Sequence, residues 1–296
     1  MRHDLAVIGA PSSAGAYAPG QEKAPAAFRR NGLLAALEQA GWRVRDMGDI
    51  AGFRWRPDPE RPRAMNLDAV RATAEAVAER VARALSDDSA VLVLGGDCTI
   101  ELGTVAGARR DGASVGLVYI DLDVDLNVPD TADGALDWTG VAHLLDVRGS
   151  LPELSGLGVD RPLLAPKNVL FFGGDIITPP ELQTIDALGL ERIALSDIES
   201  DPTGAAQRAA AWGMQFDRLL VHLDADILEY TKFPIAENVR RDHGLTLETL
   251  SLALGVLMRA PNWRALTVTE VNPDHAPDES EALRKLIAAL ASALSV

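Results

Sequence analysis

Apolar runs that end in acidic residues recur along this chain, and they constrain its fold more than any other feature. The runs Val91–Leu94, Val115–Ile120 and Leu219–Leu223 are rich in β-branched residues, which is typical of buried parallel strands. An acidic motif directly follows each run. Open α/β sheets hold their ligand sites at the carboxyl ends of the strands, so we expect these motifs to meet at one edge of a sheet.

Four motifs make up this acidic set. They are Gly95-Gly96-Asp97-Cys98, Asp121-Leu122-Asp123-Val124-Asp125, Asp224-Ala225-Asp226 and Glu270-Val271-Asn272-Pro273. A single Asp-x-Asp pair is most often a solvated turn, but aspartates that converge from two strands repel each other unless cations lie between them. Carboxylates at this density suit hard divalent ions such as Mn²⁺ or Mg²⁺. The pattern therefore predicts a metal site, with two ions as the leading arrangement.

Further runs place these motifs in an α/β fold. Strands are expected at Leu5–Ile8, Val169–Phe172 and Leu266–Val268, and helices at Leu67–Leu85, Leu247–Met258 and Glu279–Leu294. Strands that alternate with helices favour a parallel sheet covered on both faces. We expect a single domain over residues 1–296, because ligands spread from position 98 to position 226 must meet in space.

The overall composition excludes several classes of partner. The net charge of −15 disfavours nucleic acid and anionic membranes. No apolar run approaches the length of a transmembrane helix, and the acidic N-terminus is unlike a signal peptide. The single cysteine allows no intramolecular disulfide, which fits a reducing compartment, so we expect a cytoplasmic protein.

Together the motifs resemble the ureohydrolase superfamily, the group of arginase and agmatinase. The similarity covers nearly the full length, since Ile8-Gly9-Ala10-Pro11 and Pro25-Ala26-Ala27-Phe28-Arg29 are similar to the family's N-terminal segment. The resemblance implies a three-layer α/β/α sandwich with a central, mostly parallel sheet. It also implies two Mn²⁺ ions, a small guanidino-type substrate and a homo-oligomer, either a trimer or a hexamer.

The resemblance also implies roles for individual residues. Asp121 and Asp224 match the carboxylates that bridge both ions. Cys98 and Asp125 would complete one ion, and Asp123 and Asp226 the other. Glu270 matches the glutamate that pairs with the guanidinium group, a contact suited to carboxylate geometry. The substrate's other end would meet Asn127, near its carboxylate, and Glu181, at its α-amino group.

Three family histidines are replaced in this chain. Cys98 and Asp123 stand at two ligand positions, and Asp137 aligns with a histidine thought to shuttle protons. We expect Asp137 to serve as the acid for the leaving amine. The change to Cys98 resembles an atypical branch that hydrolyses N-hydroxy-guanidino compounds. Five aspartates and a thiolate would exceed the charge of two divalent ions by two, which weakens each ion as a Lewis acid.

The sequence thus predicts a metal-dependent hydrolase that cleaves a C–N bond of a guanidino or amidino compound, with an N-hydroxyguanidino compound included. The alternatives are a non-catalytic protein of the same fold with a metal-poor site, and a relative reworked for another amide or imine. A site with one ion, or with none, is also compatible with the sequence. Cys98 also fits a small buried apolar residue, and His222, two positions before Asp224, fits either a satisfied core histidine or a residue that supports the site.

Overall fold

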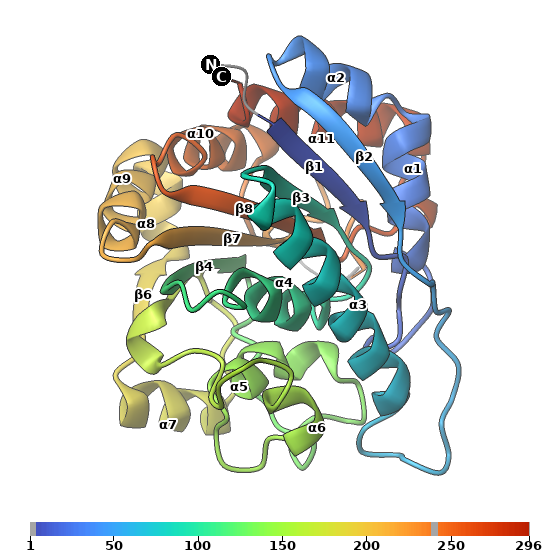
Figure 1. The fold of residues 1–296 in the computed structure, drawn as a ribbon, viewed down its shortest axis with the longest axis vertical. Helices are drawn as coiled ribbons and strands as arrows, with labels where there is room; N and C mark the ends of the chain where they lie inside the picture. Colours follow the sequence, from blue (N-terminus) through green and yellow to red (C-terminus); the bar gives the residue numbers. More distant parts are fainter. Residues whose placement is uncertain (1–3, 238–241, 296) are drawn as a thin grey trace.

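An eight-stranded, wholly parallel sheet forms the centre of the protein, as the computed structural model shows for residues 4–237 and 242–295 (Figure 1). The strands lie in the order β2-β1-β3-β8-β7-β4-β5-β6. Their bounds are β1 Asp4–Gly9, β2 Arg43–Asp49, β3 Ala90–Leu94, β4 Val115–Asp121, β5 Val169–Gly173, β6 Glu191–Ala194, β7 Arg218–Asp224 and β8 Trp263–Thr269.

Helices cover both faces of this sheet and complete a three-layer α/β/α sandwich, as predicted (Figure 1). One face is covered by α1 (Ala24–Arg30), α2 (Leu33–Gln39), α8 (Leu195–Ser200), α9 (Pro202–Gly213), α10 (Leu247–Leu257) and α11 (Glu279–Ala293). The opposite face is covered by α3 (Leu67–Ser86), α4 (Ile100–Ala108), α5 (Gly140–Leu144), α6 (Pro152–Ser155) and α7 (Pro179–Leu188). No helix in the described part of the chain is both long and apolar enough to cross a bilayer.

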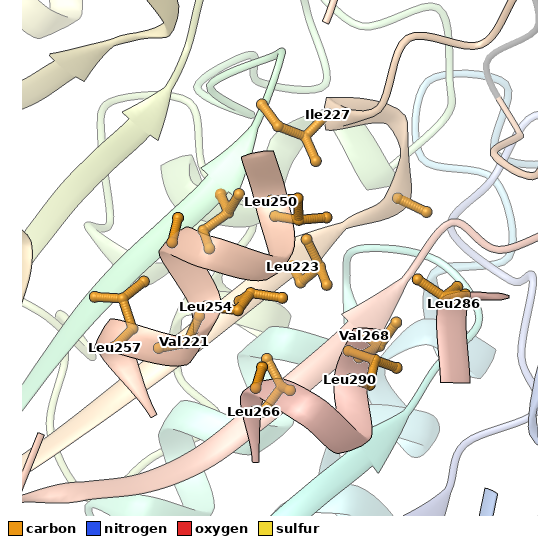
Figure 2. Close-up of a cluster of buried hydrophobic side chains, with 14 of the residues drawn as sticks. Val221, Leu223, Ile227, Leu250, Leu254, Leu257, Leu266, Val268, Leu286 and Leu290 are labelled. Carbon is orange, nitrogen blue, oxygen red and sulfur yellow. The ribbon is translucent and has the colours of Figure 1, made fainter. Parts of the chain in front are cut away.

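The alternation of side chains along each strand builds two separate cores. Leu92 and Leu94 of β3 pack into the core beneath α10 and α11, whereas Val91 and Val93 pack into the core beneath α3 and α4. Figure 2 shows part of the first core, where leucines of α10 and α11 lie on apolar residues of β7 and β8. Both faces of the central strands are therefore apolar, which explains their continuous hydrophobic runs.

The six predicted strands are present, and two more strands flank them. These two, β2 and β6, are the edges of the sheet, and both are largely exposed. An edge strand is paired on one side only and borders solvent, so its sequence carries no long apolar run. The three predicted helices are present with ends shifted by a few residues at most.

The strand order brings the four acidic motifs together. They follow β3, β8, β7 and β4, which are consecutive neighbours in the sheet, although the motifs lie far apart in the sequence. Because all four strands run in the same direction, their carboxyl ends meet at one edge. The site is therefore built at the position where open α/β sheets bind ligands.

Candidate metal centre

A small pocket at this edge gathers most of the predicted site residues. The volume that a water-sized probe can occupy in it is about 20 Å³, enough for a water molecule or an ion. The described residues that line it are eight carboxylates, two aromatic rings and a thiol: Asp121, Asp123, Asp125, Asp137, Asp224, Asp226, Glu237, Glu270, Tyr17, Trp138 and Cys98. No lysine or arginine belongs to this described lining, so the pocket is strongly anionic.

The two Asp-x-Asp motifs use the same local geometry. The Oδ1 atom of Asp121 accepts a hydrogen bond from the backbone N–H of Asp123 at 2.7 Å, and Oδ1 of Asp224 accepts one from the N–H of Asp226 at 2.6 Å. Each bond fixes the rotamer of its carboxylate and leaves Oδ2 directed elsewhere. The Oδ2 of Asp224 accepts from the Cys98 thiol at 3.0 Å, whereas the buried Oδ2 of Asp121 has no hydrogen-bond partner within residues 4–237 and 242–295.

Two groups of potential metal ligands share Asp121. The first consists of Cys98, Asp121, His222 and Asp224, and the second of Asp121, Asp123 and Asp226. Within each group the ligand atoms lie within 4.8 Å of one another. Five of the six predicted ligands are thus brought together, and Asp121 is the residue common to both groups.

Asp125 lies in the pocket but in neither group. Its Oδ2 accepts a hydrogen bond from the hydroxyl of buried Tyr119. Its backbone has φ 48°, and that of Glu270 has φ 57°, so two carboxylates of the pocket adopt the left-handed conformation. This conformation is costly for residues other than glycine, and such strain concentrates at functional sites.

Burial and mutual repulsion shape the electrostatics of the pocket in the absence of cations. Burial is the largest cause that raises the pKa values of Asp121, Asp224 and Glu270 well above their usual range, and neighbouring carboxylates raise them further. Burial likewise raises the pKa of the Cys98 thiol, and the charge of Asp224 adds to this effect. The folded chain therefore holds protons here that a bound cation would displace.

These residues fit divalent cations. A buried carboxylate oxygen without a partner is costly, and Asp121, the residue that both groups share, has such an atom in its Oδ2. A cation would satisfy it and would relieve the repulsion between the aspartates. The group of Asp121, Asp123 and Asp226 offers oxygen atoms only. The group that contains Cys98 and His222 offers oxygen, sulfur and nitrogen atoms.

Glu270 is held from two sides at the pocket wall. Its Oε1 accepts from the backbone N–H of Cys98 at 3.1 Å, and its Oε2 accepts from the side-chain amide of Gln21 at 2.9 Å. The backbone N–H of Glu270 donates to the carbonyl of Gly96 at 2.8 Å. Position 96 requires glycine because a Cβ atom there would lie 1.7 Å from the carbonyl oxygen of Ser12. Each Glu270 oxygen retains a free lone pair for a ligand.

Asp137 and two aromatic side chains line the rest of the pocket. Asp137 is buried, and its pKa is raised well above its usual range, by burial first and by the charge of Asp97 second. The rings of Tyr17 and Trp138 have centroids 6.5 Å apart, and both residues are partly exposed, at 42% and 39%. Burial and nearby carboxylates, Glu237 first, raise the pKa of the Tyr17 hydroxyl, so this group stays protonated at neutral pH.

Asn127 and Glu181 are not among the described residues that line the pocket. Oε1 of Glu181 accepts from the side-chain amide of Asn127 at 2.8 Å and from the N–H of Leu126 at 3.2 Å. Its Oε2 accepts from the N–H and the hydroxyl of Thr178 at 2.8 and 2.7 Å, which completes a capping box at the start of α7. Glu181 thus joins α7 to the loop that carries Asn127, and its predicted contact with a substrate stays a prediction.

We expect Glu181→Ala to lower the free energy of unfolding by about 2–4 kcal/mol, since it removes a cap and leaves buried donors unpaired. Chemical denaturation measures this change. Glu199→Ala, at an exposed position late in α8, is the control and is expected to change stability little. Unchanged stability of Glu181→Ala would contradict the structural role and favour the predicted contact with a substrate.

Several residues near the site carry no motif that sequence reasoning could use. Gln21 holds Glu270 from a turn of the N-terminal segment, and Glu237 reaches the pocket from the long connection between β7 and α10. Tyr17 belongs to the same N-terminal segment as Gln21. The only available signal was the similarity of that segment to the family pattern, which does not single out either residue.

Comparisons with known proteins agree with this geometry. The model of the arginase family matches residues 3–294. The mitochondrial arginase-2 of Rattus norvegicus is 29% identical over 95% of this chain and 80% of its own length. Two solved structures share the fold. The arginase from Bacillus cereus has a TM-score of 0.89 at 24% identity over 100% of this chain and 99% of its own. The proclavaminate amidino hydrolase from Streptomyces clavuligerus has a TM-score of 0.72 at 18% identity over 99% of this chain and 92% of its own. The chain therefore belongs to the arginase family.

Proposed function

We propose that this protein is a metal-dependent hydrolase that cleaves a C–N bond of a guanidino or amidino compound, with N-hydroxyguanidino compounds among the candidates. The observation that carries the proposal is the pocket of eight carboxylates, in which two groups of potential ligands share Asp121. Membership of the arginase family supports this choice of chemistry. The ions proposed are Mn²⁺, as the resemblance implies, with one exception argued below.

Glu270 is the proposed anchor for the cationic group of the substrate. A guanidinium ion presents parallel N–H donors that match the two oxygens of a carboxylate. Gln21 and the backbone of Cys98 hold both oxygens of Glu270 in place, so the carboxylate is oriented before a substrate arrives. The remaining carboxylates of the pocket favour a cation over a neutral compound.

Asp137 is the proposed acid of the reaction. Its raised pKa favours the protonated form of the buried carboxyl, and that proton can pass to the leaving amine. Divalent ions bound by the aspartates would supply the Lewis acidity that activates water. The contact between Trp138 and Tyr17 places two rings at the partly exposed side of the pocket, where they can limit access of bulk water.

We expect Glu270→Gln to lower kcat/KM by about 100-fold or more, because a charge-assisted contact in a buried site is lost. The measurement is chromatography of the products after the metal-loaded protein is incubated with arginine, agmatine and N-hydroxyarginine. Glu237→Gln makes the same change elsewhere in the pocket and is expected to have a smaller effect. Equal losses in the two variants would contradict the assigned role of Glu270, provided that both retain their metal.

The alternative is a protein that keeps the fold but binds little metal. The hydrogen bond from the Cys98 thiol to Asp224 favours it, because this bond pairs two would-be ligands with each other. Metal content after dialysis separates the two functions, since a hydrolase of this kind retains its ions.

Two further proposals concern the cellular location and the oligomeric state of the protein. We propose that it is cytoplasmic and forms a homo-oligomer, a trimer or a hexamer. The single cysteine supports the first proposal, and the resemblance to the superfamily supports the second.

A further inference from the structure

His222 is a buried histidine directly behind the Cys98 side of the pocket. It lies in β7, two residues before Asp224, and is fully buried. Its ring stacks on the ring of Tyr119, with centroids 4.1 Å apart and planes inclined by 4°. The orientation of the imidazole is therefore fixed by packing.

One nitrogen of this ring faces a buried carboxylate. Nδ1 lies 3.3 Å from Oε2 of Glu101, which stands in the first turn of α4 and is 1% exposed. The other oxygen of Glu101, Oε1, has no hydrogen-bond partner in the described structure. A histidine that binds a metal ion through one nitrogen usually donates its other N–H to a carboxylate in this way.

The other nitrogen faces the site. Nε2 lies 3.3 Å from the hydroxyl of Thr269, and the same hydroxyl lies 3.3 Å from the Cys98 sulfur. Ligand atoms of His222, Cys98, Asp121 and Asp224 all lie within 4.8 Å of one another. Asp121, whose Oδ2 has no hydrogen-bond partner within residues 4–237 and 242–295, belongs to this group. A nitrogen, a sulfur and carboxylate oxygens thus surround one position.

We propose that the two halves of the metal centre select different ions. Cys98, Asp121, His222 and Asp224 would hold a thiophilic ion such as Zn²⁺ or Co²⁺, whereas Asp121, Asp123 and Asp226 would hold a hard ion such as Mn²⁺. Thiolate and imidazole ligands suit zinc and its neighbours, and all-oxygen sets suit Mn²⁺ or Mg²⁺. The proposal rests on the proposed metal centre but not on the hydrolysis.

The neutral imidazole matters because the site already carries excess negative charge. A ligand without charge adds a donor atom and no further repulsion, which a sixth carboxylate could not do. Asp125, which the resemblance placed beside Cys98, instead accepts the hydrogen bond from Tyr119. The histidine that the family has at position 98 would thus be replaced by a cysteine together with a histidine from β7, which β8 separates from β3 in the sheet.

The test begins with the unaltered full chain, stripped of metal and titrated with Co²⁺. A thiolate bound to Co²⁺ gives a charge-transfer band in the near-ultraviolet, and we expect this band with the first equivalent. X-ray absorption at the zinc edge of the protein loaded with one equivalent of Zn²⁺ should show sulfur and imidazole scattering. Bound cobalt without the thiolate band, or zinc without imidazole scattering, would overturn the proposal.

Variants assign the two ligands. Cys98→Ser should abolish the cobalt band. His222→Gln should keep the band but weaken zinc binding by about 100-fold or more, since loss of a direct ligand should cost at least as much as the roughly 10- to 100-fold loss that is typical of a supporting partner. His143→Gln is the matched control, because His143 is also fully buried but bonds to the carbonyl of Thr139. Equal zinc affinity in His222→Gln and the unaltered protein would overturn the role of His222. If that variant does not fold, the zinc-edge spectrum of the unaltered protein still decides the question.

The outcomes also separate this proposal from the proposed function. The mixed centre would be overturned if two Mn²⁺ ions bind with equal affinity and the first equivalent shows no preference for Zn²⁺ or Co²⁺ over Mn²⁺. That result would not contradict the proposed hydrolase function. A protein that binds none of these ions would overturn both.

Discussion

Asp121→Asn is expected to lower the affinity for divalent ions by about 100-fold or more at both positions of the centre. Asp121 is the one residue common to both groups of potential ligands, so the loss of its charge weakens each ion. Loss of a direct ligand should cost at least as much as loss of a supporting partner, for which roughly 10- to 100-fold is typical. The asparagine oxygen can still accept the hydrogen bond from the N–H of Asp123, so the loop geometry should survive.

Isothermal titration calorimetry of the metal-free variant measures this loss. Asp123→Asn is the matched control, since it makes the same chemical change in a residue that belongs to one group only. We expect the control to affect the second ion and to leave the first nearly unchanged. Similar affinities of both ions in the two variants would contradict the sharing of Asp121.

The metal-free protein should become less stable as the pH rises from about 5 to 8. The folded-state pKa values of Asp121, Asp125, Asp224 and Glu270 are raised, so the folded chain binds more protons than the unfolded chain above the ordinary carboxyl pKa. Stability is then fully present below the unfolded pKa and is lost as the pH rises through the folded one. Each extra bound proton contributes a slope of about 1.4 kcal/mol per pH unit. His143 opposes this trend, because burial lowers its pKa to about 4, but it is a single group.

Thermal unfolding in the presence of a chelator, followed across pH, tests this expectation. Saturating metal should remove the trend, because bound cations replace the protons. Metal-free Asp121→Asn should be more stable than the unaltered protein near pH 8, since the neutral amide can be buried without taking up a proton. A metal-free protein whose stability stays constant or rises over this pH range would show that the carboxylates stay ionised, and would contradict the electrostatic account.

The sequence predicted the strands that are buried on both faces, and it missed the strands at the edges. β3, β4 and β7 are almost wholly buried, so they read as apolar runs. β2 is largely exposed and reads Arg43-Val44-Arg45-Asp46-Met47-Gly48-Asp49, in which no apolar run exists. Its pairing with β1 depends on the tertiary fold, which local sequence does not encode.

The same limit applies to the site. The acidic motifs were recognisable because each follows a buried strand, and the structure places Cys98, Asp121, Asp123, Asp125, Asp224, Asp226, Asp137 and Glu270 around one pocket. Successive side chains of a strand alternate between its two faces, which indicated that His222 faces the same side as Asp224. Its contact with Glu101 depends on how α4 packs against β7, and the contact of Gln21 with Glu270 depends on the position of the short 3₁₀ helix Gln21–Lys23. Neither contact follows from local sequence.

The dependence of urea release on bound metal tests the central claim most directly. The protein is assayed with arginine, agmatine and N-hydroxyarginine as purified, after removal of metal by a chelator, and after return of Mn²⁺, Zn²⁺ or both ions. We expect release from at least one of these compounds, its loss on chelation and its recovery when metal returns. A protein that binds its metal fully and releases urea or a substituted urea from none of them would contradict the account.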